Sequence, residues 1–417
     1  MLGQNNEQDI ITGIDVGSTA IRVAVGQVDH NSDPTGLKII GAVEAPSEGV
    51  SKGVVNSIED TVSSISQALE KAERLIGIPI EDAWVGFSDK DIKTKESKGV
   101  IAVAKSDGEI SHDDVDRAVE AARTVAPPLN YEMLHVIPRR YTVDGQEGIK
   151  DPVGMTGVRL EVETKIIHGL TTHLNNISKA VYRTGIDIND LVLSVLAAGD
   201  VVTTEKQRDL GVATVNIGGS ITSLVVYENG DIIHTATIPI GSEHITNDLA
   251  IGLRSSIDIA EKVKINYGYC VPEEVQDDEK IDLSSVGAEE SETISREYIA
   301  QVIKARTEEI FEKVDEELRS VQKSGLLPAG VVFTGGGSKL GGIDTLAKDK
   351  LRLPASLGYP KGISSITEEA NDLSFTTAIG LIKWGASLEQ VEDSGVSFDF
   401  VSGSWGRIKD VFKSLLP

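Results

Sequence analysis

The sequence predicts an α/β fold of two related lobes, with a smaller subdomain inserted in the first lobe and an amphipathic helix at the C-terminus. The two lobes are indicated by two strand pairs of the same form, IITGIDVGSTAIRVAVGQV from Ile10 and VATVNIGGSITSLVVYENG from Val212. In each, an apolar strand runs into a turn rich in Gly, Ser and Thr, and a second strand follows. A third Gly-rich turn follows an apolar strand in VVFTGGGSKLGGI, from Val331.

These three turns have the composition of anion-binding loops. Gly lets the backbone approach an anion closely, Ser and Thr add hydroxyl donors, and the flanking strands hold each loop in place. Two phosphate-binding hairpins followed by a Gly-rich nucleoside loop predict a nucleotide cleft between two related halves. The alternative is that all three are structural hairpins.

Helical and extended segments alternate through the first half. The expected elements are paired strands over Ile10–Val28, a helix over Ser57–Ile76, a strand over Ala83–Phe87, a strand over Gly99–Ala104, a helix over Ser111–Val125 and an extended segment over Tyr131–Val143. The first helix is predicted by apolar residues at helical spacing, among them Ile58, Val62 and Ile65. The second has Ser111 as its N-cap and acidic residues in its first turn.

The second half continues the alternation. The expected elements are a helix over Thr171–Thr184, a buried strand over Leu191–Leu196, a hairpin over Val212–Val226, and helices over Asp248–Tyr267, Ser295–Val321, Leu346–Leu351 and Thr377–Trp384. The acidic stretch Glu273–Glu292 indicates loop and short strand. Glu389–Ser404 is acidic and poor in periodicity, which is typical of a flexible linker.

Composition excludes several classes of protein. The 417 residues carry 40 Lys and Arg against 65 Asp and Glu, a formal charge of −25, which disfavours nucleic acid as a partner. The single cysteine, Cys270, allows no internal disulfide and fits a reducing compartment. The start of the chain lacks an apolar signal core, and no run approaches the length of a membrane span. We therefore expect a cytoplasmic protein.

The last residues, SWGRIKDVFKSLLP, form a basic amphipathic segment on an acidic protein. Its apolar positions near one helical face are Trp405, Ile408, Val411, Phe412, Leu415 and Leu416, and its flanking bases are Arg407, Lys409 and Lys413. This pattern predicts an interfacial helix on an anionic membrane surface. One such anchor binds weakly, and many along a polymer bind strongly through effective concentration. The alternative is a terminal helix docked on the protein's own core.

Longer strings add a family resemblance. With the three turns, the chain resembles the actin/Hsp70/sugar-kinase superfamily and, within it, the FtsA family of bacterial cell division. DGQEGIKDPVGMTGVRLEVETKIIHG from Asp144 is similar to the FtsA-specific insertion, and IPIGSEHITNDLAIGL from Ile238 and IAEKVKINYG from Ile259 are similar to the second half of its cleft. The resemblance runs from about Asp9 to Gly385 and resumes at the C-terminal segment.

The resemblance implies an actin-like two-lobed ATPase fold with an FtsA-type insertion. Its implied parts are residues 9–87 and 166–205 as the core of the first lobe (1A), 88–165 as the inserted subdomain (1C), 206–240 and 329–386 as the core of the second lobe (2A), 241–328 as its outer subdomain (2B), 387–403 as linker and 404–417 as the membrane-targeting helix.

By this resemblance the cofactors are ATP and Mg²⁺. The nucleotide-binding positions are Asp15, Gly17, Ser18, Thr19, Asn216, Gly218, Gly219, Ser220, Thr222, Gly241, Glu261, Lys264, Gly335, Gly336, Gly337 and Ser338. Asp15 would hold the Mg²⁺ through water, although an Asp there can also simply shape the turn. Glu261 and Lys264 would point at ribose or adenine, or else belong to a solvated helix face.

The second hairpin departs from the family pattern. Relatives usually carry acids where this chain has Asn216 and Ser223. Without those carboxylates the metal and the attacking water are held less well, so we expect nucleotide binding with slow or absent hydrolysis. Asp200 could orient a water, and a surface carboxylate at a strand end is the plainer interpretation.

The implied function is an ATP-binding protein that polymerises on the inner face of the cell membrane at the division septum, tethers FtsZ filaments and recruits late division proteins through the inserted subdomain. The FtsZ C-terminal peptide would meet Arg296, Lys304 and Arg306, unless these bases pair with Glu308 and its neighbours. The alternatives are a small-molecule kinase of the same superfamily and a related scaffold of pilus assembly.

Overall fold

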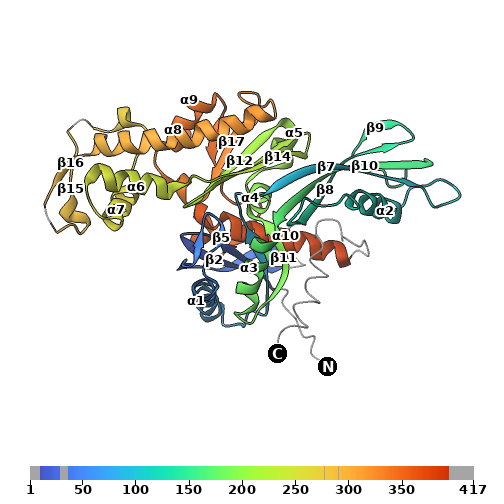
Figure 1. The fold of residues 1–417 in the computed structure, drawn as a ribbon, viewed down its shortest axis with the longest axis horizontal. Helices are drawn as coiled ribbons and strands as arrows, with labels where there is room; N and C mark the ends of the chain where they lie inside the picture. The colour runs from blue at the N-terminus through green and yellow to red at the C-terminus, as the bar shows by residue number, and fades with distance from the viewer. Residues whose placement is uncertain (1–9, 29–35, 277, 290, 394–417) are drawn as a thin grey trace.

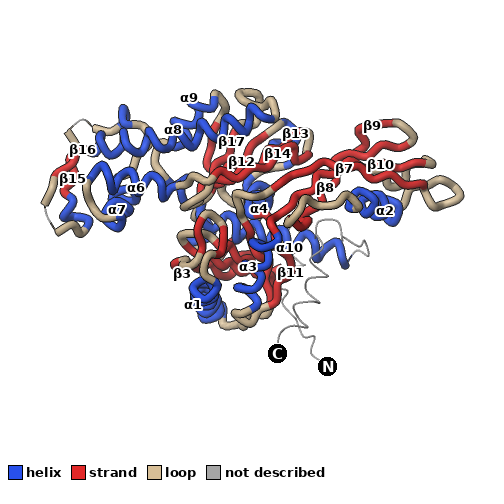
Figure 2. The backbone as a smooth tube through the Cα atoms, viewed as in Figure 1, coloured by secondary structure: helices blue, strands red, loops and turns tan. Residues whose placement is uncertain are grey.

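The computed structural model describes residues 10–28, 36–276, 278–289 and 291–393. Two lobes lie one above the other, and each carries a subdomain that projects to one side (Figure 1). The inserted subdomain extends to the right in this view and the outer subdomain of lobe 2 extends to the left. Figure 2 shows that long strands dominate the first of these subdomains and helices the second.

Lobe 1 is built on a six-stranded sheet with the order β11-β6-β1-β2-β3-β19. Its strands are β1 (Ile10–Val16), β2 (Ala20–Val28), β3 (Leu37–Pro46), β6 (Asp82–Phe87), β11 (Asp187–Leu193) and β19 (Ser364–Ser365). Its helices are α1 (Ile58–Ile76), α3 (Thr171–Tyr182), α4 (Ser194–Val202) and α10 (Thr376–Asp393). A small hairpin, β4 (Val50–Ser51) and β5 (Val54–Val55), follows β3.

Helix α1 forms where the spacing of apolar residues predicts it. The side chain of Ser57 caps its first turn by accepting from the amide of Asp60, and Gly77 ends it in the left-handed conformation at φ 73°. Ile65, Ala68 and Leu69 on one face are buried in the core of lobe 1. The periodicity therefore identified both the element and its buried face.

The inserted subdomain has its own sheet and core. It consists of β7 (Lys93–Ala102), α2 (His112–Arg123), β8 (Tyr131–Val143), β9 (Gln146–Ile149) and β10 (Arg159–Leu170), with the strand order β7-β10-β8-β9. Ser111 caps α2, and the carboxylate of Asp114 accepts from both the amide and the hydroxyl of Ser111. Strand β10 continues to Leu170, beyond the predicted end of the insertion.

Lobe 2 is built on a five-stranded sheet with the order β14-β13-β12-β17-β18. Its core elements are α5 (Glu205–Leu210), β12 (Val212–Ile217), β13 (Thr222–Glu228), β14 (Asp231–Ile238), β17 (Val331–Thr334), α9 (Ile343–Leu351) and β18 (Ala355–Leu357). The outer subdomain consists of α6 (Ser242–Leu253), α7 (Ile257–Tyr267), β15 (Lys280–Asp282), β16 (Thr293–Ser295) and α8 (Arg296–Ser320).

Two element predictions were wrong. The single helix expected over Asp248–Tyr267 is two helices, α6 and α7, because Arg254 takes the left-handed conformation at φ 49° and ends the first. The buried strand expected to reach Leu196 ends at Leu193, and α4 begins at Ser194. A short apolar run does not distinguish a buried strand from a buried helix.

The end of the chain also differs from the predicted division. Strand β19 pairs with β3, and Ala378, Ile379 and Leu381 of α10 belong to the core of lobe 1. The chain therefore returns to lobe 1, although residues 329–386 were assigned to lobe 2. Helix α10 continues to Asp393, so the first part of the predicted linker is helical. The predicted membrane helix, 404–417, lies outside the described residues. Within them, no helix combines the length and apolarity that a membrane crossing requires.

Candidate functional site

The turns of the two related hairpins meet between the lobes. The hydroxyl of Ser220, in the β12–β13 turn, donates to the hydroxyl of Ser18, in the β1–β2 turn, at 2.6 Å. Gly219 lies so close to the first turn that an added Cβ would stand 2.4 Å from Cγ2 of Thr19. A side chain at position 219 would push the lobes apart, so this Gly is required by close approach.

The third Gly-rich loop joins the same region from lobe 2. It follows β17 and begins with Gly335 at φ 86°, where a Cβ would come within 2.2 Å of Oδ1 of Asn216. Gly336 and Gly337 follow in a short 3-10 helix, Gly336–Lys339. All three predicted turns therefore lie together, as the order of the motifs predicted.

The turn of the second hairpin also caps helix α6. The amides of Ser242 and Glu243 donate to the carbonyls of Gly218 and Gly219 at 2.9 and 2.8 Å. These helix amides are thus already used by the protein. Gly241 is the N-cap residue, and its role here is to let the turn and the helix start pack closely.

A cavity of about 1180 Å³ opens between the lobes and the outer subdomain of lobe 2. Of the predicted nucleotide-binding residues, those that line it are Thr19, Gly218, Gly219, Glu261, Lys264, Gly336 and Gly337. Its lining carries four basic side chains, Arg22, Lys71, Lys264 and Lys339, and six acidic ones, Glu44, Glu243, Asp258, Glu261, Glu369 and Asp372. The volume is slightly above the range of about 300–1,000 Å³ that is usual for small-molecule and cofactor sites, so the cavity is large enough for a nucleotide.

Asp15 ends β1 just before the first turn. Burial raises the pKa of its carboxyl to about 6, against the opposing effects of Arg22 and of a hydrogen bond from Ser194. Asp15 and Arg22 are register partners across the hairpin. Asp15 is not among the residues that line the cavity, although Thr19 of the same hairpin and its register partner Arg22 are.

Asn216 occupies the equivalent place at the end of β12. Its amide nitrogen donates to Oγ1 of Thr377, on α10, at 3.2 Å. Ser223 is its register partner on β13 and is buried. This half of the site has the same backbone geometry as the first half and lacks its carboxylate.

Glu261 and Lys264 form a polar cluster on α7 rather than a freely solvated face. Nζ of Lys264 lies 2.7 Å from Oε2 of Glu261 and donates to the hydroxyl of Thr246 at 2.8 Å. Lys264 is buried, and both side chains border the cavity. They can orient polar groups of a ligand.

Other predicted residues support the loops instead of facing the cavity. The hydroxyl of Thr222 donates to the carbonyl of Ile240 at 2.8 Å, and that of Ser338 donates to the carbonyl of Thr334 at 2.6 Å. Both residues are fully buried.

The sequence reasoning missed Arg22, Lys71 and Lys339, which supply three of the four bases of the cavity. Arg22 pairs with Glu44 at 3.2 Å, and its Nε is buried without a partner among the described residues. A signal for Arg22 existed, because it is a charged residue in an apolar strand, across the hairpin from Asp15. Lys71 gave no such signal, since it lies on the polar face of α1.

Asp200 does not belong to this cavity. It lies in α4 and borders a separate cavity of about 390 Å³, between the inserted subdomain and lobe 2. Burial alone would raise the pKa of its carboxyl, but ion pairs with Lys383 and Arg208 outweigh burial and lower it. Its carboxylate is thus held in ion pairs away from the cavity between the lobes, and Asp200 lies within a helix rather than at the strand end assumed in its plainer interpretation.

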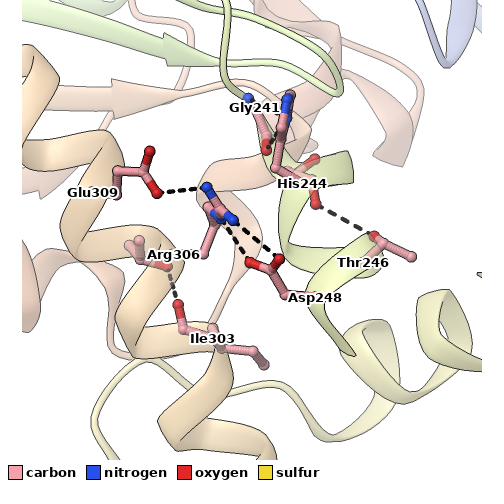
Figure 3. A network of polar contacts seen from close by, with 9 residues as sticks. Gly241, His244, Thr246, Asp248, Ile303, Arg306 and Glu309 are labelled. Atoms are coloured by element: carbon pink, nitrogen blue, oxygen red, sulfur yellow. Dashed lines mark hydrogen bonds and ion pairs between the residues drawn. The ribbon is translucent and has the colours of Figure 1, made fainter. Parts of the chain in front are cut away.

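The three bases proposed for a partner peptide all lie on α8 and are all ion-paired. Arg306 contacts Asp248 of α6 through two nitrogens, at 2.6 and 3.0 Å, and Glu309 through a third (Figure 3). The other two pairs are Arg296 with Glu279 and Lys304 with Glu273. The pair of Arg306 with Glu309 matches the alternative of pairing with Glu308 and its neighbours, whereas the partners of Arg296 and Lys304 lie outside α8.

Comparison with known proteins agrees with this geometry. The family model described as "Cell division protein FtsA" matches residues 213–380, and the model described as "SHS2 domain inserted in FTSA" matches residues 90–168. Cell division protein FtsA of Bacillus subtilis is 37% identical over 94% of this chain and 87% of that protein. The protein of the same name from Pseudomonas aeruginosa is 36% identical over 95% of this chain and 93% of its own.

Solved structures show the same architecture at low sequence identity. A PilM-PilN complex of type IV pilus biogenesis matches 90% of this chain and 98% of the solved chain, with a TM-score of 0.64 and 15% identity. MreB5 of Spiroplasma citri, bound to ADP, matches 92% of this chain and 98% of its own, with a TM-score of 0.55 and 13% identity. The fold therefore defines an actin-like protein with an SHS2 insertion. Within that class, the chain belongs to the FtsA family of cell-division proteins.

Proposed function

We propose that this protein binds ATP with Mg²⁺ in the cavity between the lobes and hydrolyses it slowly. The observation that carries the proposal is the meeting of two related hairpin turns and a third Gly-rich loop beside one cavity. Two phosphate loops that face one another can hold a polyphosphate from both sides. Arg22 and Lys339 supply positive charge next to them.

The acidic excess in the lining supports Mg²⁺ as a companion of the nucleotide. A polyphosphate alone would meet Glu243 and Glu44 without enough opposing charge, while a bound divalent cation compensates for both. Asp15 is the carboxylate we assign to the metal, through water. Asn216, which brings no charge, is the reason we expect slow turnover.

The protein, we further propose, polymerises on the inner face of the cell membrane, tethers FtsZ and recruits late division proteins through the inserted subdomain. Membership in the FtsA family supports the partners, and the basic amphipathic segment from Trp405 supports peripheral attachment at the septum. The kinase alternative has less support, because the second hairpin has Asn216 and Ser223 where relatives carry acids, and a kinase has no use for a membrane-binding segment. The pilus-scaffold alternative shares the fold, at much lower identity than the FtsA relatives.

Sedimentation with anionic liposomes tests the tether. The full chain should carry FtsZ into the liposome pellet, and a chain truncated after Gly403 should not. Trp405→Glu should act like the truncation, because a charge on the apolar face costs a few kcal/mol, comparable to the whole net anchor.

A matched control is Ser414→Glu, which adds the same charge on the polar side of the proposed helix, near Arg407 and Asp410. Sedimentation should also decrease with salt, since Arg407, Lys409 and Lys413 would face anionic lipid. A truncated chain that sediments as well as the full one would show that the segment docks on the protein itself, and the tether proposal would fail.

A further inference from the structure

The inserted subdomain contacts lobe 2 as well as lobe 1, from which its chain departs and to which it returns. Nζ of Lys165, a buried side chain of β10, donates to the carbonyl of Ile233 on β14. The hydroxyls of Thr94 (β7) and Thr235 (β14) lie 3.2 Å apart. β14 is an edge strand of the five-stranded sheet of lobe 2, so no further strand of the sheet pairs with its outer side. The inserted subdomain contacts the backbone on that side.

Two ion pairs extend this contact. Nε of Arg140, on β8, donates to Asp231 at 3.2 Å, and Nζ of Lys150, just after β9, donates to Asp209 of α5 at 3.2 Å. Lys150 and Asp209 are exposed, so their pair contributes little. The buried lysine is the stronger element, since its loss would leave a carbonyl at the interface without its donor. We call these four contacts the latch.

The base of the inserted subdomain is fixed to lobe 1. Nδ1 of His173 lies 2.6 Å from Oδ2 of Asp89, and these two residues stand at the two chain crossings. Nε2 of the buried His135 accepts from the amide of Leu193 at 2.9 Å. Leu134 of the same strand packs in the core of lobe 1. The subdomain therefore follows lobe 1, and the latch spans the two lobes.

The latch and the nucleotide cavity lie on opposite sides of the contact between the lobes. The cavity is bordered by α7 on the left in Figure 1, and the latch is formed by β7, β8 and β10 on the right. Between them α4 of lobe 1 packs closely on β13 of lobe 2, because Gly199 leaves no room for a Cβ, which would stand 2.6 Å from the hydroxyl of Tyr227. A rotation about this contact that narrows the cavity would widen the latch side.

We propose that the inserted subdomain is a latch that holds the lobes apart at the cavity and is released when a nucleotide draws them together. The inference rests on the proposed nucleotide site. Because coupling between two sites is reciprocal, a partner that pulls the subdomain away from lobe 2 tightens nucleotide binding by the same factor. A partner that binds the subdomain is thereby sensitive to whether the cavity holds a nucleotide.

A disulfide across the latch tests this directly. Thr94→Cys with Thr235→Cys places two sulfur atoms where hydroxyls are 3.2 Å apart, close enough for an S–S bond of about 2.05 Å after a small rotation. Cys270, the sole native cysteine, is buried, and burial raises the pKa of its thiol to about 12, so it will not compete. ATP affinity is measured on the full chain after oxidation with diamide and again after reduction with dithiothreitol.

The oxidised double variant should bind ATP about 5- to 150-fold more weakly than the same sample after reduction, which is the usual span of such coupling. Saturating ATP·Mg²⁺ should also slow formation of the disulfide. The two single-cysteine variants are the controls and should bind like the unmodified protein. Equal affinity in both redox states would overturn the latch, as would failure of the disulfide to form without ATP.

Lys165→Met is an independent test, in which ATP affinity should change in the opposite direction. Removing the buried donor should tighten ATP binding, and Lys98→Met, which removes a β7 lysine paired within the subdomain to Glu163, should leave it unchanged. Unchanged affinity in Lys165→Met would contradict the latch. If the unmodified protein itself fails to bind ATP, the proposed function fails, and slower cross-linking in the presence of ATP cannot occur either.

Discussion

Asn216 is the residue on which the rate of the proposed ATP hydrolysis depends. Asn216→Asp would place a carboxylate at the end of β12, beside the third loop, in the position equivalent to Asp15. We predict that turnover increases at least about tenfold, which corresponds to 1.36 kcal/mol of transition-state stabilisation. Phosphate release under saturating ATP·Mg²⁺ measures it.

The control for this variant is Asn56→Asp, which adds the same charge at an exposed position just before α1. It should leave turnover unchanged. A fast rate in the unmodified protein, or no gain in Asn216→Asp, would mean that the missing carboxylate does not limit hydrolysis.

Asp190 makes stability depend on pH. Burial raises the pKa of its carboxyl to about 8, against one hydrogen bond from the amide of Leu191, and Oδ2 has no partner among the described residues. The folded state therefore holds this proton more tightly than the unfolded chain, whose Asp titrates near 3.9. Its stabilising contribution is complete below about pH 4 and is lost as pH rises toward about 8.

Asp190→Asn should consequently gain stability relative to the unmodified protein as pH rises from 5 to 8, by at most about 1.4 kcal/mol per pH unit. Urea unfolding at several pH values measures the difference. Asp349→Asn, at an exposed position of α9, is the matched control for the substitution itself. A constant difference for Asp190→Asn would contradict this explanation.

At the scale of elements, α8 carries the proposed contact with the FtsZ peptide. An acidic peptide would have to replace Glu279 and Asp248 as partners of Arg296 and Arg306. We predict that Arg296→Ala with Arg306→Ala weakens binding of an FtsZ C-terminal peptide about tenfold or more, because charge-assisted hydrogen bonds contribute about 1.5–3 kcal/mol each. Fluorescence anisotropy of a labelled peptide measures the change.

Lys313→Ala is a control on the same helix, since Lys313 is exposed and pairs only with Glu316 among the described residues. It should bind the peptide normally. Unchanged affinity in the double variant would refute the assignment of the peptide site to this end of α8.

The sequence was informative wherever a local pattern decides the structure. Apolar spacing and caps identified α1 and α2, and the repeated strand–turn–strand pattern identified both hairpins. Patterns failed where the outcome depends on distant packing: Arg254 breaks a continuous periodic segment, and α10 returns to lobe 1 because Ala378 and Leu381 pack against β1 and β6.

In the candidate site, too, some residues could be predicted from local sequence patterns and others could not. The Gly-rich turns could be found because close backbone approach demands glycine at particular positions, such as 219 and 335. Lys71 and Lys339 could not be assigned, because their place in the cavity is set by how the lobes face one another. The ion pair of Asp200 with Lys383 could not be predicted for the same reason, since Lys383 is far along the chain.

For the whole molecule, we propose that the two lobes close on ATP. The inserted subdomain and the C-terminal segment are both linked to this closure. The net charge of −25 keeps such a protein apart from anionic membranes unless the basic segment and repeated copies along a polymer overcome it. The nucleotide site, its slow hydrolysis and the latch all depend on the cavity between the lobes.

Titration calorimetry of ATP in the presence of Mg²⁺ measures whether the cavity binds a nucleotide. Gly336 is the position to vary, because it borders the cavity and the nearest atom to an added Cβ is 3.8 Å away, so the fold itself tolerates a side chain there. The unmodified protein and Gly336→Ala should bind ATP, and Gly336→Trp, whose side chain would block the approach of the nucleoside to the third loop, should lose binding at unchanged thermal stability. No binding by the unmodified protein, or equal binding by Gly336→Trp, would contradict the account.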